Sequence, residues 1–444
     1  MDELHKAFHP VTAADWKARL EKDLKGITFE QLSLSDRDGI TIRPFYTQED
    51  LSGQPEPVIK QAGWSICAQI KATDAVKANQ QALQELNNGA SGLCFLIDED
   101  TDPAVLLQGI ELPFIYTHFK CNSYNPAFIA ALKAYAAQQG WDWSQAESFI
   151  TFDYVGHYLQ QGAWAQNQEQ SEAGFTAFLT ATEGMSAIGI DAALYHNAGA
   201  TAAYGLACTI AHVNEYLNLT EDKQRVKNIG KLHVTLAAGT TFFEQIAQLR
   251  ASRVLLNLLC QQYNIQPELH LHLETGNSYR SPFDSYSNLL RDSIAAMAAV
   301  IGGCNSLYIR PFDETLKASN DFSRRMSRNQ QLIFKEESYL DKVADIAAGS
   351  YYLETLTDEI AAKAWQQFKQ IEQAGGLIAA FEQGIIKATI EQQADQLVQE
   401  YKEGKRVLIG VNKFPDPKDK PEAATTLRQA SKGIRPLQLA QEII

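Results

Sequence analysis

The chain has 444 residues, and 45% of them are hydrophobic, so it can bury a large core in one domain with extensions or in two domains. Its formal net charge is −14, which argues against nucleic acid as a partner because a phosphate backbone attracts basic surfaces. A few local Lys or Arg residues would still be enough to bind a small phosphate-bearing molecule.

The sequence carries no pattern typical of export or of a membrane span. No apolar run reaches the roughly 18 residues that a membrane-spanning helix needs. The N-terminal stretch 1–24 is acidic and amphipathic and lacks the apolar centre of a secretory signal. The six cysteines are scattered, without a closely spaced pair, which indicates buried reduced thiols. We therefore expect a cytoplasmic protein with no membrane partner.

Residues 1–60 are interpreted as an N-terminal arm. A helix is expected over Ala13–Leu24, with a capping start at Thr12, and a strand-like piece over Ile40–Tyr46. The turn-forming stretch 52–58 closes the segment. The arm has too little apolar content to fold alone, so we expect it to wrap the main domain or a partner.

From Trp64 the chain alternates short β-like runs with helical patterns. The runs are Trp64–Ile70, Gly92–Ile97, Leu112–Phe119, Ser148–Asp153, Ser186–Asp191, Lys231–Ala237, Glu268–Glu274 and Asn305–Arg310. Helices are expected over 74–88, 125–139, 198–216, 241–263 and 284–301, with a less regular helical segment over 155–182. Such alternation predicts parallel strands joined by right-handed crossovers. Residues 61–315 are therefore predicted to form an α/β fold, a (β/α)8 TIM barrel. The alternative, a doubly wound sheet, lacks a GxGxxG-type turn in the first crossovers.

The part of the chain that follows the barrel reads as helical and then as a linker. Helices are expected over 320–339, 355–374, 376–387 and 390–403, which gives a helical extension over 316–403. Residues 404–444 are interpreted as a linker-like tail, with a charged, Pro-rich stretch over 415–426. The last residues, Gln438–Ile444, look too short for a further domain.

One cluster of possible metal ligands stands out by its spacing. His270, His272 and Glu274 alternate along the seventh strand, so they share one face and could hold a divalent metal in a barrel hydrolase. His233 on the sixth strand is the only obvious addition, and it lies deep in its strand. The simpler interpretation, which we favour, is a set of polar side chains that line the barrel and hydrogen-bond to one another. We expect no metal.

A second candidate pair follows the fifth strand. Tyr195 and His196 lie in the turn that links the strand Ser186–Asp191 to a helix, and barrels place their chemistry on such loops. A histidine there could act as a base or donate a hydrogen bond to a carbonyl. The alternative is a loop histidine whose ring is satisfied by a backbone group.

Downstream motifs add a family resemblance. They are Asn288–Arg291, Phe322–Arg325, Arg328–Asn329, Glu336–Ser338, Gly349–Tyr351, Glu372 with Gly375–Gly376, and also Ala198–Ala200, 242–253 and 410–414. Over about residues 60–414 the chain resembles the methylmalonyl-CoA mutase family. The resemblance implies a (β/α)8 barrel threaded by CoA and followed by a cobalamin-binding domain. It also implies interconversion of (R)-methylmalonyl-CoA and succinyl-CoA by a radical route that uses adenosylcobalamin.

This chain departs from the catalytic pattern of that family. Ala193 and Leu194 stand where catalytic members carry the Tyr-His pair whose His holds the thioester carbonyl. Gln69 falls in the region of the family's Arg-x-Tyr motif, and His270-Leu271-His272 where catalytic members have Arg-Thr-His. No His follows His272, so the later residues offer no imidazole for cobalt.

The resemblance therefore implies the non-catalytic small (β) subunit of a heterodimeric mutase, trimmed to the barrel and its helical extension. It would have no catalytic residues and would bind no cofactor. Adenosylcobalamin would lie in the partner, the mutase large subunit, which this chain would stabilise. The candidate residual pocket is Tyr195, His196, His270, His272 and Glu274.

Two alternatives stay open, and one structural consequence can be checked. The chain could be a catalytic barrel that works with a separate cobalamin-binding chain, with His196 as the thioester donor, or a homodimer that binds CoA esters. If the barrel takes no substrate, its interior should be filled, because an empty cavity costs stability. We expect bulky residues to fill it, among them Phe95, Phe114, Tyr116, Phe152 and Tyr195.

Overall fold

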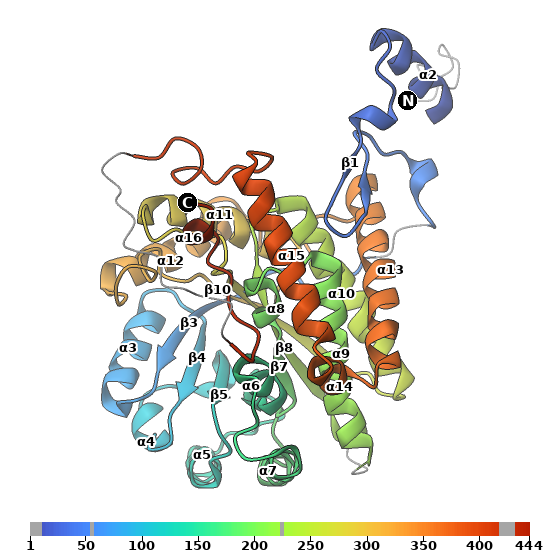
Figure 1. Ribbon diagram of the computed structural model, residues 1–444. Helices are drawn as coiled ribbons and strands as arrows, with labels where there is room; N and C mark the ends of the chain where they lie inside the picture. Colours follow the sequence, from blue (N-terminus) through green and yellow to red (C-terminus); the bar gives the residue numbers. More distant parts are fainter. Residues whose placement is uncertain (1–10, 54–56, 223–225, 417–430) are drawn as a thin grey trace, which may run out of the picture.

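The computed structural model describes residues 11–53, 57–222, 226–416 and 431–444 (Figure 1). Eight parallel strands form one sheet in the order β6-β5-β4-β3-β10-β9-β8-β7. A parallel bridge between Phe149 and Ser186 joins the two edge strands and closes the barrel. The strands are β3 (Ser65–Lys71), β4 (Gly92–Ile97), β5 (Tyr116–Cys121), β6 (Ser148–Phe152), β7 (Gly189–Asp191), β8 (Lys231–Ala238), β9 (Glu268–Thr275) and β10 (Ser306–Tyr308). The predicted (β/α)8 barrel is confirmed.

Helices connect the strands around the outside of the barrel (Figure 1). Several start at an Asp or Asn whose side chain accepts a hydrogen bond from the first turn, as Asp74, Asn125 and Asp284 do. The helices are α3 (Ala75–Asn87), α4 (Pro103–Leu106), α5 (Pro126–Gln139), α6 (Tyr154–Gln161), α7 (Gln168–Ala181), α8 (Ala193–Asn197), α9 (Ala202–Asp222), α10 (Phe242–Gln262) and α11 (Ser285–Ile301), with 3-10 turns at Leu112–Phe114 and Val226–Asn228.

Two of the expected boundaries were wrong for local reasons. The third strand starts at Tyr116 because Leu112–Phe114 forms a 3-10 turn around Pro113, which has no backbone N–H to donate to a sheet. The expected turn after β7 is the short helix α8. Helix α9 starts only at Ala202, because Gly199 has a φ of 96°, a backbone conformation that a helix cannot contain.

After β10 the chain forms the helices α12 (Asp321–Leu332), α13 (Tyr351–Gln373), α14 (Leu377–Glu382) and α15 (Ile385–Lys402), with a π-helical turn at Ile333–Glu337. The break expected between 387 and 390 lies instead at Gly384, whose φ is 79°. The fully buried Arg250 of α10 ties this extension to the barrel. It forms an ion pair with Asp345 and donates to both carboxylate oxygens of Glu354, at 2.8 and 2.9 Å.

The N-terminal segment has an anchored half and a projecting half. Helix α2 (Ala13–Asp23) begins with the capping box expected at Thr12, and a small hairpin pairs β1 (Leu34–Ser35) with β2 (Thr41–Ile42), flanked by 3-10 turns at Glu30–Leu32 and Gln48–Asp50. The buried Asp38 accepts hydrogen bonds from Thr201 Oγ1 (2.5 Å) and the Ala203 amide (2.9 Å), so it caps α9. Helix α2 has no buried residue and projects from the body (Figure 1).

The last residues return to the barrel. Residues 431–444 end in the short helix α16 (Leu439–Glu442) and lie across loops that follow the strands. The amides of Ile434, Leu437 and Leu439 donate to the carbonyls of Leu159 (2.8 Å), Asn197 (2.7 Å) and Ser278 (3.2 Å). The linker-like interpretation of 404–444 gave no hint of this contact.

Because Leu437 is fully buried, truncation to alanine should leave a cavity under the tail. We expect Leu437→Ala to lower the free energy of unfolding by about 2–5 kcal/mol, measured by urea denaturation. Leu316→Ala is the matched control, since Leu316 is 52% exposed, and it should change stability by less than about 0.5 kcal/mol. Equal effects would mean that the tail does not pack on the barrel.

Candidate functional site

Aromatic and imidazole rings fill the barrel axis. Tyr116 on β5 stacks on His270 of β9 at 4.5 Å between ring centroids, and its hydroxyl lies 2.8 Å from Nε2 of His233 on β8. Phe149 on β6 lies 4.9 Å from His233 and 4.8 Å from His270. Because β5 is not adjacent to β8 or β9 in the sheet, these rings meet across the interior rather than along one wall.

The next interior layer is polar and internally hydrogen-bonded. His118 Nε2 lies 2.8 Å from the Thr151 hydroxyl, and its ring centroid lies 4.1 Å from that of His233. His272 Nδ1 lies 2.7 Å from the Ser306 hydroxyl, which also contacts His270 Nε2 at 2.8 Å. The imidazole rings therefore pack against one another and hydrogen-bond to the hydroxyls of Thr151 and Ser306.

Charged groups at the C-terminal ends of the strands are paired with each other. Lys120 forms an ion pair with Asp191, and Arg310 forms one with Glu274. Gln69 Nε2 donates to Glu274 Oε1 at 3.3 Å. Burial raises the pKa of Glu274, but Arg310 and Lys120 outweigh burial and hold it below its usual value. Each charged group in this set is therefore neutralised by a neighbouring group of opposite charge.

A cavity of about 200 Å³ remains at this end of the barrel. Its lining comes from β4 to β8 and α6, namely Leu96, His118, Lys120, Cys121, Asn122, Thr151, Asp153, Gly156, His157, Gln160, Ile190, Asp191 and Thr235. Pockets for cofactors and drug-sized ligands usually enclose about 300–1,000 Å³. The space left at the mouth is therefore smaller than a cofactor site requires.

The imidazoles of the interior are held neutral. Burial lowers the pKa of His118 and His233 well below the usual value, and that of His272 to about 3. Within the described ranges no group of three or more His, Cys, Asp or Glu residues has the arrangement of a metal site. The hydrolase hypothesis for His270, His272 and Glu274 thus finds no support in their geometry: apart from His272 Nε2, which has no hydrogen-bond partner among the described residues, their polar atoms contact Ser306, Glu147, Arg310 and Gln69.

Tyr195 and His196 occupy different surroundings from the strand histidines. The Tyr195 ring is buried, and its hydroxyl lies 3.2 Å from His212 Nδ1 on α9. The His196 ring packs closely against Gly239 and Gly276, the residues that follow β8 and β9. A Cβ atom added to Gly239 would lie 2.6 Å from the ring, and one added to Gly276 would lie 3.0 Å from it. Burial, with a smaller contribution from Arg37, lowers the pKa of His196 to about 4. Neither side chain lines the mouth cavity.

The prediction that five bulky residues fill the interior was wrong for four of them. Phe95 packs outward, 5.8 Å from Phe119, and Phe152 lies 5.9 Å from Phe178 of α7. Phe114 is 80% exposed. Tyr195 packs against α9, and only Tyr116 fills the axis. Successive strand residues face opposite sides, so Cys94 rather than Phe95 points inward.

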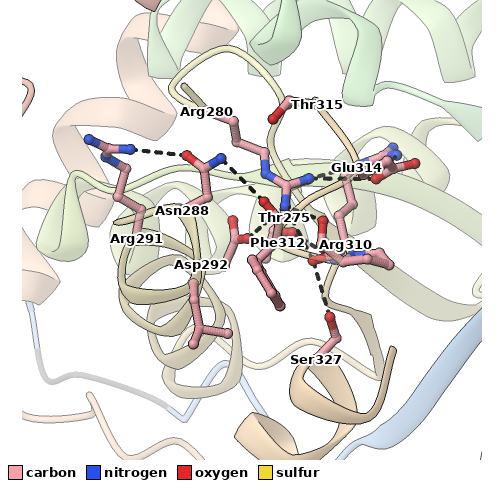
Figure 2. A network of polar contacts seen from close by, with 12 residues as sticks. Thr275, Arg280, Asn288, Arg291, Asp292, Arg310, Phe312, Glu314, Thr315 and Ser327 are labelled. Carbon is pink, nitrogen blue, oxygen red and sulfur yellow. Dashed lines mark hydrogen bonds and ion pairs between the residues drawn. The ribbon is translucent and has the colours of Figure 1, made fainter. Parts of the chain in front are cut away.

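Figure 2 shows a polar network that joins the loops after β9 and β10. Asn288 Nδ2 donates to the Ser281 carbonyl and its Oδ1 accepts from the Ser281 amide, both at 2.8 Å, and Arg291 donates to the same Oδ1 at 3.0 Å. Arg280 donates to Asp292 (3.1 Å) and to the Pro311 carbonyl (2.6 Å). The motif Asn288–Arg291 therefore holds backbone loops in place.

Comparison with known proteins places the chain in a family. The family model described as methylmalonyl-CoA mutase matches residues 97–441. A methylmalonyl-CoA mutase small subunit from Porphyromonas gingivalis is 31% identical, with 94% of this chain and 71% of that protein covered. The chain belongs to the methylmalonyl-CoA mutase family. A small subunit from Streptomyces virginiae is 29% identical (93% and 71% covered), and a methylmalonyl-CoA mutase from Rhizobium meliloti is 29% identical (91% and 64% covered).

The positions that depart from the family's catalytic pattern have structural contacts. Leu194 lies in α8 with 8% of its surface exposed and packs in the main core. The Ala193 amide donates to Asp191 Oδ1 at 3.2 Å. Gln69 is bound to Glu274. Among the helices of the described residues, none combines the length and apolar character needed to cross a membrane.

The neutral buried histidines predict a loss of stability in acid. An unfolded chain binds a proton at each His near pH 6.5, whereas folded His272 and His196 bind one only near pH 3 and 4. Stability should therefore be complete above about pH 6.5 and fall below it, by up to about 1.4 kcal/mol per pH unit for each such His. Urea denaturation between pH 7 and 5 measures this slope.

His272→Asn should make that slope shallower by roughly one histidine's contribution, because asparagine does not titrate. His157→Asn, at an exposed histidine, is the control and should leave the slope unchanged. The same slope in both variants would contradict the buried, neutral state of His272.

Proposed function

We propose that this chain is the non-catalytic small subunit of an adenosylcobalamin-dependent methylmalonyl-CoA mutase. The heterodimer would interconvert methylmalonyl-CoA and succinyl-CoA, and this chain would stabilise the large catalytic subunit. The names of the Porphyromonas gingivalis and Streptomyces virginiae relatives support the small-subunit assignment. All six cysteines are free and buried, which is consistent with a cytoplasmic enzyme.

The filled barrel interior carries the proposal. In catalytic relatives, as the family resemblance implies, CoA threads the barrel. Here Tyr116, Phe149, His233 and His270 meet on the axis. A pantetheine chain could pass only if several of these rings left together, and each is packed against the others.

The residues at the site do not fit the reaction or its cofactor. Leu194 has no hydrogen-bond donor for a thioester carbonyl, and its side chain lies in the core. Residues 273–444 contain no His, so they offer no imidazole ligand for cobalt. We therefore assign no catalytic step to this chain and expect adenosylcobalamin to be bound by the large subunit.

The projecting arm supports a role in assembly. Helix α2 buries none of its residues on the body of the protein. Trp16 stacks on Phe45 at 4.4 Å, yet Phe45 stays 46% exposed, and Leu34 and Val11 are about 70% exposed. Apolar side chains on an extension of this kind are typical of a segment that packs on another chain.

The alternatives find less support. A catalytic barrel working with a separate cobalamin chain would need His196 as donor, but that ring lies between the strand ends near Gly239 and Gly276. A homodimer that binds CoA esters would need more space than the cavity of about 200 Å³ at the mouth.

We expect the purified chain alone to show no turnover of succinyl-CoA, with or without adenosylcobalamin. Co-expression with the mutase large subunit should give a stable 1:1 complex by size-exclusion chromatography, with mutase activity that depends on the large subunit's cofactor. Leu194→His should not create turnover in the isolated chain, because the interior stays filled. Conversion of succinyl-CoA by this chain unaided would overturn the proposal.

Deletion of residues 1–35 tests the arm. It removes α2 and its apolar side chains but keeps Asp38, which caps α9. We expect at least a roughly tenfold weaker complex with the large subunit, measured by titration, because the arm's apolar contacts are lost. The unfolding midpoint of the isolated chain should stay unchanged, and unchanged affinity would contradict the arm's role.

A further inference from the structure

The outward face of α11 is apolar. Tyr286, Leu290 and Ile294 follow one another at four-residue spacing, so they form one stripe on the helix. Their exposed fractions are 67%, 68% and 45%. Exposed apolar side chains are common singly, but a connected stripe of three large ones is a feature of binding surfaces.

The stripe continues onto the neighbouring segments. Phe312 stacks on Tyr286 at 5.4 Å and contacts Phe322 of α12 edge-on at 6.1 Å, and Phe322 is 49% exposed. On the other side, Arg291 donates to the carbonyl of Ile409, which is 50% exposed. Five exposed residues therefore make one surface, the α11 face: Tyr286, Leu290, Ile294, Phe322 and Ile409.

The charged residues of α11 are held by hydrogen bonds within the chain. The helix contains only two, Arg291 and Asp292. Arg291 is bound to Asn288, and the fully buried Asp292 is bound to Arg280 and Tyr279 (Figure 2). In a chain with 21% charged residues, a 17-residue helix with only these two charges, both bonded within the chain, fits a covered surface better than an open one.

Two cations lie at the rim of the face, where Asp321 beside Phe322 is already paired with Arg324. Arg325 lies over the Phe322 ring at 6.0 Å. Lys413 forms a backbone bridge with Ile409 and lies over the Phe414 ring at 5.4 Å. Within the described ranges neither cation forms an ion pair with a carboxylate.

The charges at the rim bear on whether the partner is a second copy of this chain or a different chain. A second copy would bring the same two cations to the contact, so like charges would meet there. A different chain with an apolar surface ringed by carboxylates fits both features. A stable interface of standard size buries about 800 Å² on each partner, so a second contact surface beside the arm would contribute to that area.

We propose that the α11 face is a docking surface for the mutase large subunit, which meets it with an apolar helical surface flanked by Asp and Glu side chains. The inference rests on the function proposed above and adds a second contact to the arm. The arm and the α11 face then bind the same partner at two separate places, which makes the complex tighter than either contact alone.

The test is a binding titration of the full chain against the large subunit at several salt concentrations. Leu290→Glu should weaken binding at least roughly 30-fold, since a charge would be buried at the centre of the interface. Arg325→Glu should weaken it roughly tenfold and flatten the salt dependence. Val76→Glu is the control, at a 55% exposed position of α3, and should change affinity less than about twofold. Each isolated variant should keep the wild-type unfolding midpoint.

The other outcomes are distinct. If Leu290→Glu binds like the wild type while deletion of residues 1–35 weakens the complex, the α11 face is overturned and the small-subunit function stands. If the wild-type chain forms no complex with the large subunit, both fail. If the isolated chain is a dimer that Leu290→Glu converts to a monomer, the face joins two copies of this chain and the proposal is overturned.

Discussion

The interior of an eight-stranded barrel must either be filled with side chains or hold something else, because unfilled apolar space costs about 24 cal/mol per Å³. This chain fills it with rings from opposite walls. The ring centroids of Tyr116, Phe149, His233 and His270 lie 4.5–6.2 Å apart, and the hydroxyls of Ser306 and Thr151 hydrogen-bond to His270 and His118. Every other feature of the site follows from that packing.

A filled interior changes what the mouth can do. The charges there pair among themselves, as Lys120 does with Asp191 and Arg310 with Glu274. The tail at 431–444 then lies over the loops, with Leu437 buried. Exposed apolar side chains lie outside the barrel, on the arm and on α11, where the partner contacts are proposed. The distribution of buried and exposed groups thus fits the role proposed above, in which this protein binds another chain.

The strand rhythm was enough to predict the barrel, because alternating strands and helices leave few other topologies. The family motifs also predict departures from the catalytic pattern at Ala193, Leu194 and Gln69, and these stay predictions. Which rings fill the interior could not, because that depends on the parity of each strand. Phe95 and Phe152 are bulky but face the helices, whereas their neighbours face inward. The tail was missed because its partners Leu159, Asn197 and Ser278 lie about 160 to 275 residues away along the chain.

The strand histidines show why spacing alone does not identify chemistry. His270 and His272 have the alternation of metal ligands, but a metal needs two or three lone pairs aimed at one point. Here both rings contact the same serine hydroxyl and stack on Tyr116, which leaves them spread around an aromatic centre. To open a path for CoA along the axis, Tyr116, Phe149 and the imidazoles would all have to be replaced by smaller side chains. Each replacement would leave a hydroxyl without its hydrogen-bond partner or create a cavity. If the chain is non-catalytic as proposed, the obstacle to substrate is therefore distributed over the whole interior, and no single substitution would remove it.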